Sequence, residues 1–332
     1  MNMKTWFEEL LAAPTKKAMP VLSFPSTSLL DITVGELIND SALQAKGMKM
    51  IADRCDTSAA VSMMDLSVEA EAFGSTIRTE DHEVPTVIGS IVNDEDDANN
   101  LKVPQVGTAR TGLYVEAIRQ ACTLITDRPV FAGVIGPFSL SGRLMDMTEI
   151  MVNCYAEPDM VHTTLTKTTE FLIEYGKAYK AAGASGIVMA EPAAGLLSPD
   201  LIQEFSTPYV KQIVDALQTD DFAVVYHNCG NTVQLIDSIK TIGAAAYHFG
   251  NAIDMEEMMQ VIPADMIAMG NIDPSSQFKN GTPESIYEQT TELMGKCTKY
   301  PNFVISSGCD IPPLAPWDNI DSFFKAVADF YA

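Results

Sequence analysis

A repeating alternation of short apolar runs and longer helical stretches is the feature of this sequence that most limits its fold. From Pro129 onward, runs rich in β-branched and aromatic residues end in Gly, Pro or Asn. These runs span residues 129–137, 186–192, 222–231, 244–251, 266–274 and 303–313. Amphipathic stretches between them span residues 157–181, 199–217, 254–261 and 283–299. Such alternation is typical of βαβ units, which build a parallel sheet.

The first part of the chain fits the same pattern less clearly. We expect two further strands and two helices there, at residues 20–27, 59–66, 43–54 and 113–126 respectively. The total of about eight strands, preceded by an N-terminal helix at Thr5–Ala12, predicts an α/β fold of the (β/α)8 TIM-barrel type. A length of 332 residues suits one barrel, so residues 1–332 are expected to form a single domain. A doubly wound open sheet is the alternative, but no Gly-rich phosphate-binding sequence follows the first expected strand.

The charge balance limits the partners of the protein. The chain has 44 acidic and 21 basic residues, a formal net charge of −23, and residues 92–100 are expected to form an acidic surface loop or helix start. Nucleic acid and anionic membranes are therefore not expected as partners, because both require a basic surface. Glu8 and Glu9 interrupt any signal peptide, and no apolar stretch has the length of a membrane span. We expect a cytoplasmic protein with reduced thiols.

Residues able to bind a metal follow several of the expected strands, where barrel enzymes carry their catalytic groups. His227 and Cys229 are two positions apart and can share one face of a strand, while Cys309 follows the last expected strand. One imidazole and two thiolates suit zinc, and three protein ligands leave one position open, as in catalytic sites. The alternative from the residues alone is a rim histidine with two cysteines that act as small core side chains.

The remaining cysteines and histidines have weaker signals. The cysteines expected to be core or half-buried thiols lie in or beside helical stretches: Cys55, Cys122, Cys154 and Cys297. His82 and His162 have no evident partner. His248 ends an expected strand, so it is expected to support the metal site or to contact substrate, the alternative being a role in loop structure.

A resemblance to a known family rests on five segments: EPAAGLLSPDLIQEFSTPYVKQIVDAL (191–217), YHNCGN (226–231), GAAAYHFGN (243–251), MGNIDP (269–274) and ISSGCDIPPLAPWDNIDSFFKAV (305–327). They resemble the uroporphyrinogen decarboxylase superfamily, whose SP-x5-F-x2-PY signature corresponds to Ser198–Tyr209. The His-x-Cys pair with a later Cys resembles its zinc-dependent, corrinoid-linked methyltransferase branch, typified by methylcobamide:coenzyme M methyltransferases. The resemblance is clear from about Pro129 onward and diffuse before it.

The resemblance implies a zinc-dependent methyltransferase of one-carbon metabolism, with zinc held by His227, Cys229 and Cys309. Zinc would bind and deprotonate the thiol of a small acceptor. That thiolate would attack the methyl group on the cobalt of a methylcorrinoid, forming the S–CH3 bond and breaking the Co–CH3 bond to leave Co(I). The corrinoid is expected on a separate protein that docks around the barrel mouth, because this chain has no D-x-H-x-x-G pattern.

The resemblance also suggests roles for three other residues. Glu191 is expected to be a fourth zinc ligand when substrate is absent, or a proton acceptor, the alternative being a buried carboxylate that caps the following loop. Asn271 and Asp273 are expected to shape the acceptor pocket through hydrogen bonds.

Three other functions remain open. A related enzyme could take methyl from a methoxyaromatic, a methylamine or methanol to cobalt, and a closed zinc site would suit an accessory partner of a corrinoid protein. Tetrapyrrole decarboxylation is disfavoured, because residues 20–35 contain no arginine and a polycarboxylate substrate requires cationic groups. We further expect no catalytic side chain before about Asp31.

Overall fold

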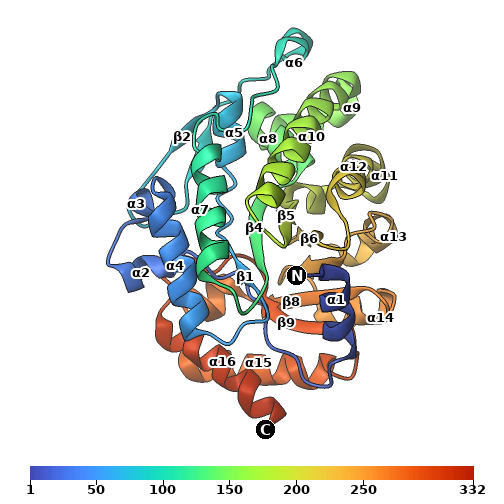
Figure 1. Ribbon diagram of the computed structural model, residues 1–332. Coiled ribbons are helices and arrows are strands. Elements are labelled where there is room, and N and C mark those ends of the chain that lie inside the picture. The colour runs from blue at the N-terminus through green and yellow to red at the C-terminus, as the bar shows by residue number, and fades with distance from the viewer.

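The centre of the protein is a curled sheet of seven parallel strands, seen in a computed structural model that describes all 332 residues (Figure 1). Each strand pairs in parallel with the next one in the order β1-β4-β5-β6-β7-β8-β9. The strands are β1 (Ala60–Val61), β4 (Val130–Ile135), β5 (Gly186–Ala190), β6 (Ala223–Asn228), β7 (Ala246–Phe249), β8 (Ile267–Ile272) and β9 (Phe303–Ser307). All carboxyl ends of the strands therefore lie at one edge of the sheet.

Helices connect the strands and cover the outside of the sheet (Figure 1). Before β4 these are α1 (Met3–Ala12), α2 (Ser26–Leu30), α3 (Val34–Ile38), α4 (Ser41–Arg54), α5 (Val68–Phe73), α6 (Glu95–Asn100) and α7 (Thr111–Leu124). After β4 they are α8 (Pro137–Met145), α9 (Met147–Ala156), α10 (Pro158–Ala181), η1 (Pro192–Leu196), α11 (Pro199–Phe205), α12 (Thr207–Leu217), η2 (Val233–Leu235), α13 (Ile236–Ile239), α14 (Met255–Val261), η3 (Pro274–Lys279), α15 (Pro283–Cys297) and α16 (Trp317–Tyr331). None of these helices combines the length and the apolar composition needed to cross a bilayer.

Local sequence chemistry fixes many of the helix boundaries. Side chains of Asp40, Ser198 and Thr282 accept hydrogen bonds from the first backbone N–H groups of α4, α11 and α15. Proline occupies the first turn of α8, α10, α11 and α15, where its missing N–H costs no intrahelical bond. The expected helix at 199–217 divides into α11 and α12 at Ser206, two residues before Pro208, because proline cannot donate to the preceding turn.

An extended N-terminal segment, residues 18–24, lies in the gap between β1 and β9. The Met19 N–H donates to the Ile305 carbonyl of β9 at 3.0 Å, and the Ser58 N–H donates to the Ala18 carbonyl at 2.9 Å. The strand expected at residues 20–27 is therefore wrong, since these contacts form no strand ladder and α2 begins at Ser26. Prolines at positions 20 and 25 lack the N–H groups that a ladder requires.

Other elements were not expected from the sequence. They include α8 and α9 between β4 and α10, the C-terminal helix α16, and an antiparallel hairpin of β2 (Thr76–Arg78) with β3 (Thr86–Ile88). The acidic stretch contains α6, whose N-terminus is capped by Asp94.

Side chains inside the curled sheet form a small core separate from the larger core under the outer helices. Inward positions recur at every second residue, such as Ala223 and Val225 on β6 and Val304 on β9. Met3, Phe7 and Leu10 of α1 close the amino-terminal end of this inner core. Continuing each inward series toward the carboxyl ends brings polar side chains into the interior: His227 on β6, His248 on β7 and Ser306 on β9.

Candidate metal centre

Three side chains from distant parts of the chain meet at the carboxyl edge of the sheet. His227 is on β6, Cys229 directly follows β6, and Cys309 follows β9. One ligand atom from each lies within 4.8 Å of the other two. The parallel order of the sheet and its curl bring β9 around to the mouth reached by β6. The structure thus brings together the three residues that were expected to bind zinc.

The surroundings of His227 fit a metal ligand. The side chain is buried, and its Nε2 atom has no hydrogen-bond partner. A buried polar atom without a partner is costly, so native structures rarely leave one unless another ligand satisfies it. One imidazole nitrogen and two sulfurs form a donor set that zinc binds readily. The residues present therefore fit a zinc ion.

The two thiols of this group are electrostatically coupled. The Cys309 thiol donates to the Cys229 sulfur, and this bond together with His227 lowers the pKa of Cys229 below that of an ordinary thiol. The same bond, together with burial, raises the pKa of Cys309. The two sulfurs hold one proton between them. A metal ion would replace this proton, because cysteine binds metal as a thiolate.

The other four cysteines have a different environment. Burial raises the pKa of Cys55 and Cys297 to about 12 and the pKa of Cys122 and Cys154 to about 11. These side chains are buried or half-buried, and no disulfide links any cysteine of the chain. They are protonated thiols in apolar surroundings, as expected from the sequence.

His248 lies behind His227. Its Nδ1 atom is 2.7 Å from Nδ1 of His227, and its Nε2 atom is 2.7 Å from the Ser306 hydroxyl. Burial lowers the pKa of His248 well below its usual value, and the neighbouring His227 adds to this effect. Both ring nitrogens are thus engaged inside the protein, which favours a supporting role over contact with substrate.

Glu191 lies at the junction between β5 and α8. Its two carboxylate oxygens accept hydrogen bonds from the backbone N–H groups of Phe138 at 2.7 Å and Ser139 at 2.8 Å. Burial raises the pKa of Glu191 to about 7. The carboxylate does not belong to the group of ligand atoms formed by His227 and the two cysteines. Its hydrogen bonds cap the N-terminus of α8.

Asn271 and Asp273 also hold backbone groups. The Asn271 amide donates to the carbonyls of Gly250 and Ile253, and the Asp273 carboxylate caps η3. Both residues line a cavity of about 270 Å³ that does not include the three metal-type ligands.

Several polar residues of the mouth gave no clear sequence signal. Arg110 forms a buried ion pair with Asp65 at 2.5 Å and a second one with Glu71 at 2.7 Å. Asp310, next to Cys309, accepts a hydrogen bond from the Met64 N–H, and burial raises its pKa to about 8. Ser306 could have been proposed from its position two residues after the inward-facing Val304, but its partners depend on the tertiary fold.

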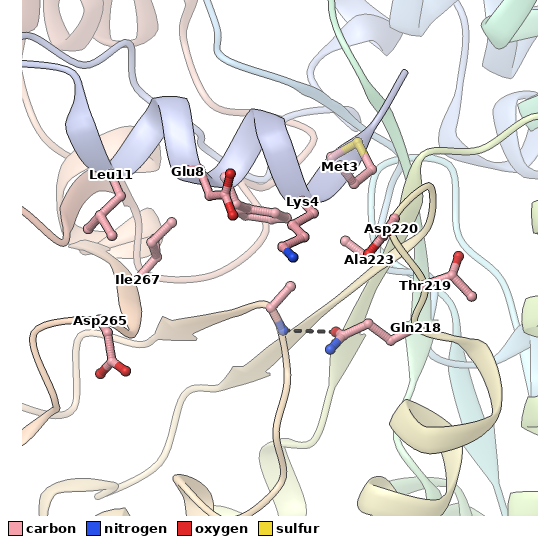
Figure 2. Close-up of a pocket in the computed structure, with 12 residues that line it drawn as sticks. Met3, Lys4, Glu8, Leu11, Gln218, Thr219, Asp220, Ala223, Asp265 and Ile267 are labelled. Carbon is pink, nitrogen blue, oxygen red and sulfur yellow. Dashed lines mark hydrogen bonds between the residues drawn. The ribbon is translucent and has the colours of Figure 1, made fainter.

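A cavity of about 400 Å³ lies at the opposite end of the curled sheet, under α1 (Figure 2). Side chains of Lys4, Glu8 and Leu11 face Asp220 and Ile267 across it. Because Ala223, which also lines the cavity, begins β6 and His227 lies near the end of that strand, this cavity is remote from the metal-type ligands.

The chain matches a known protein family over nearly its whole length. The family described as uroporphyrinogen decarboxylase (URO-D) matches residues 11–330 of the chain. This protein belongs to the uroporphyrinogen decarboxylase family. The names of similar proteins describe two kinds of reaction, methyl transfer and decarboxylation.

One relative is the methylcobamide:CoM methyltransferase MtbA of Methanosarcina acetivorans, 27% identical over 274 residues, which span 80% of this chain and 78% of the relative. Another is a uroporphyrinogen decarboxylase of Coxiella burnetii, 27% identical over 292 residues, covering 82% of this chain and 77% of the relative. The solved structure of a methyltransferase from Methanosarcina mazei has the same fold, with a TM-score of 0.88, 23% identity and complete coverage of both chains.

Proposed function

We propose that this member of the uroporphyrinogen decarboxylase family is a zinc-dependent methyltransferase. It would move a methyl group between a corrinoid (methylcobamide) protein and a small thiol such as coenzyme M. The observation that carries the proposal is the group formed by His227, Cys229 and Cys309, with the unpartnered Nε2 atom of His227. The name of the methylcobamide:CoM methyltransferase relative agrees with this activity.

Three residues of the site would bind the metal, and their open side would face the partner protein. His227, Cys229 and Cys309 would hold the zinc ion, which when bound supplies the Lewis acidity that keeps an acceptor thiol deprotonated. His227 is buried, whereas both cysteines are half-buried, so the open side of the group faces the mouth of the sheet. The corrinoid protein would dock at this mouth.

Decarboxylation of a tetrapyrrole has less support. A substrate with several carboxylates requires free cationic side chains. Every arginine except Arg143 already pairs with a carboxylate of the chain. The residues between positions 20 and 35 contribute no arginine.

We also interpret the curled sheet as a TIM-type barrel that residues 18–24 close. The chain would form one domain and act as a cytoplasmic enzyme.

Methyl transfer from free methylcobalamin to a panel of thiols tests the proposal, with zinc content measured on the same samples. We expect transfer to at least one thiol by the wild-type protein and none by Cys309→Ala. Cys122→Ala is the matched control, because it removes a half-buried thiol outside the group. Zinc-loaded wild-type protein that transfers methyl to no thiol would contradict the proposal.

A further inference from the structure

The interior of the sheet contains a continuous chain of hydrogen bonds that ends at His227. It runs from the backbone carbonyl of Met19 to the Ser306 hydroxyl at 2.8 Å, and from that hydroxyl to Nε2 of His248 at 2.7 Å. The last contact joins Nδ1 of His248 to Nδ1 of His227 at 2.7 Å. His248 and Ser306 are buried, so water does not compete for these bonds.

The direction of every proton in this chain follows from its first atom. A carbonyl oxygen can only accept a hydrogen bond, so the single proton of Ser306 must point to Met19. The Ser306 oxygen then accepts from Nε2–H of His248. A neutral imidazole carries one proton, and therefore Nδ1 of His248 presents a lone pair to His227.

The same reasoning fixes the state of His227. Its Nδ1 atom must donate the proton of the contact with His248, which leaves a lone pair on Nε2. The carbonyl oxygen of His248 lies 3.3 Å from the same Nδ1 atom and can also only accept, so it favours the same arrangement. Nε2 is the buried atom without a partner, which the metal centre requires as a ligand.

We infer that the Met19 carbonyl, Ser306 and His248 form a relay that holds His227 in the tautomer able to bind metal through Nε2. His248 and Ser306 are thus positioning residues, because they act on the metal only through His227. Hydrogen-bond partners behind a metal-binding histidine fix its tautomer and orientation, and their removal typically weakens metal binding about 10–100-fold. The inference deepens the proposed function and rests on its metal site.

The relay has a specific requirement for the N-terminal segment. Met19 belongs to the extended residues 18–24, which are held against β9 by the backbone bond from Met19 to Ile305. The segment therefore contributes a main-chain oxygen to the centre, although it contributes no side chain to the relay.

Two neighbouring serines of β9 provide a matched test. Ser306 and Ser307 are both buried, and both bond to the N-terminal segment, Ser306 to the Met19 carbonyl and Ser307 to the Val21 N–H. Zinc affinity, measured by competition with a chelator, should fall about 10-fold or more in Ser306→Ala and stay near the wild-type value in Ser307→Ala. Equal affinities in the two variants would overturn the relay.

A double-mutant cycle and NMR examine the mechanism itself. Because Ser306 acts through His248, Ser306→Ala should cause no further loss of zinc affinity in a His248→Leu background; an additive loss would refute the relay.

NMR can report the tautomer of each histidine directly. The chain has four histidines, so their ¹⁵N resonances can be assigned individually. We expect His248 to carry its proton on Nε2, and a proton on its Nδ1 would overturn the relay. If wild-type protein bound no zinc, the proposed function would fail, whereas the tautomer of His248 would still decide the relay.

Discussion

Gly136 lies against the side chain of Glu191, and a Cβ atom at position 136 would come within 2.4 Å of Glu191 Cδ. The carboxylate cannot easily move aside, because the N–H groups of Phe138 and Ser139 hold both of its oxygens. This contact joins the end of β5 to the turn between β4 and α8. It makes the junction intolerant of even one added methyl group.

Gly136→Ala should therefore destabilise the protein. Overpacking of a filled interior typically costs about 1–3 kcal/mol, and we expect a loss of that size in the free energy of unfolding by urea. Gly35→Ala is a suitable control, because a Cβ atom there meets only the Thr33 hydroxyl at an ordinary 3.7 Å. Equal stabilities of the two variants would show that the β4–α8 turn can relax.

Glu191→Gln should affect stability more than metal content. An amide offers only one acceptor oxygen to the two N–H groups of α8, and a buried unsatisfied group costs about 1–3 kcal/mol. Because Glu191 lies outside the ligand group, zinc content should stay at the wild-type value. Methyl transfer should fall less than in Cys309→Ala, and a loss of zinc in Glu191→Gln would restore the expectation that this carboxylate is a ligand.

Cys309→Ala should lose the zinc ion that we expect wild-type protein to hold. The substitution removes one of two sulfur ligands and leaves a buried imidazole with a single thiol. Metal analysis after dialysis against a weak chelator measures the effect, with Cys122→Ala as the control. An undiminished zinc content in Cys309→Ala would exclude the proposed ligand set.

The stability of the protein should depend on the protonation of Glu69. Burial raises the pKa of Glu69 from 4.5 to about 8 in the folded protein, and one of its oxygens has no partner. The folded state therefore binds more protons than the unfolded state between these values. This contribution to stability is fully present below pH 4.5 and is lost as the pH rises through 8.

Urea unfolding of wild type and Glu69→Gln across that pH range isolates the effect. Glutamine imitates the protonated acid, so the free energy of unfolding of the Glu69→Gln protein should fall less with rising pH than that of wild type. Other buried carboxyl groups contribute equally to both proteins. Parallel pH profiles would mean that Glu69 is ionised in the folded state.

Binding of the acceptor thiol should release about one proton near neutral pH. A free thiol with a pKa near 8.5 must become a thiolate when it coordinates zinc. Calorimetry in buffers with different ionisation enthalpies counts this proton. A thiol that binds with no proton release, or equally well to zinc-free protein, would favour the methyl-donor or accessory alternatives.

Much of the architecture was predictable because it depends on local periodicity. The runs at 129–137, 186–192 and 222–231 contain β4, β5 and β6, since β-branched runs between turn residues have few other stable conformations. The prediction of a strand at residues 20–27 was wrong because this part of the chain fills the gap between β1 and β9 without forming a strand ladder. No local pattern in the sequence distinguishes these two situations.

The sequence by itself placed His227 at the end of one strand and Cys229 two positions later, and the two-residue period of β structure lets both side chains turn to the same side. Only the tertiary structure decided what lies around them. The contact of His248 with Ser306 joins residues 58 positions apart, and the contact of Ser306 with Met19 joins residues 287 positions apart. Glu191 likewise meets α8 across more than 50 positions. Such pairs depend on how the sheet curls and closes, which is a property of the whole packed chain rather than of any segment in it.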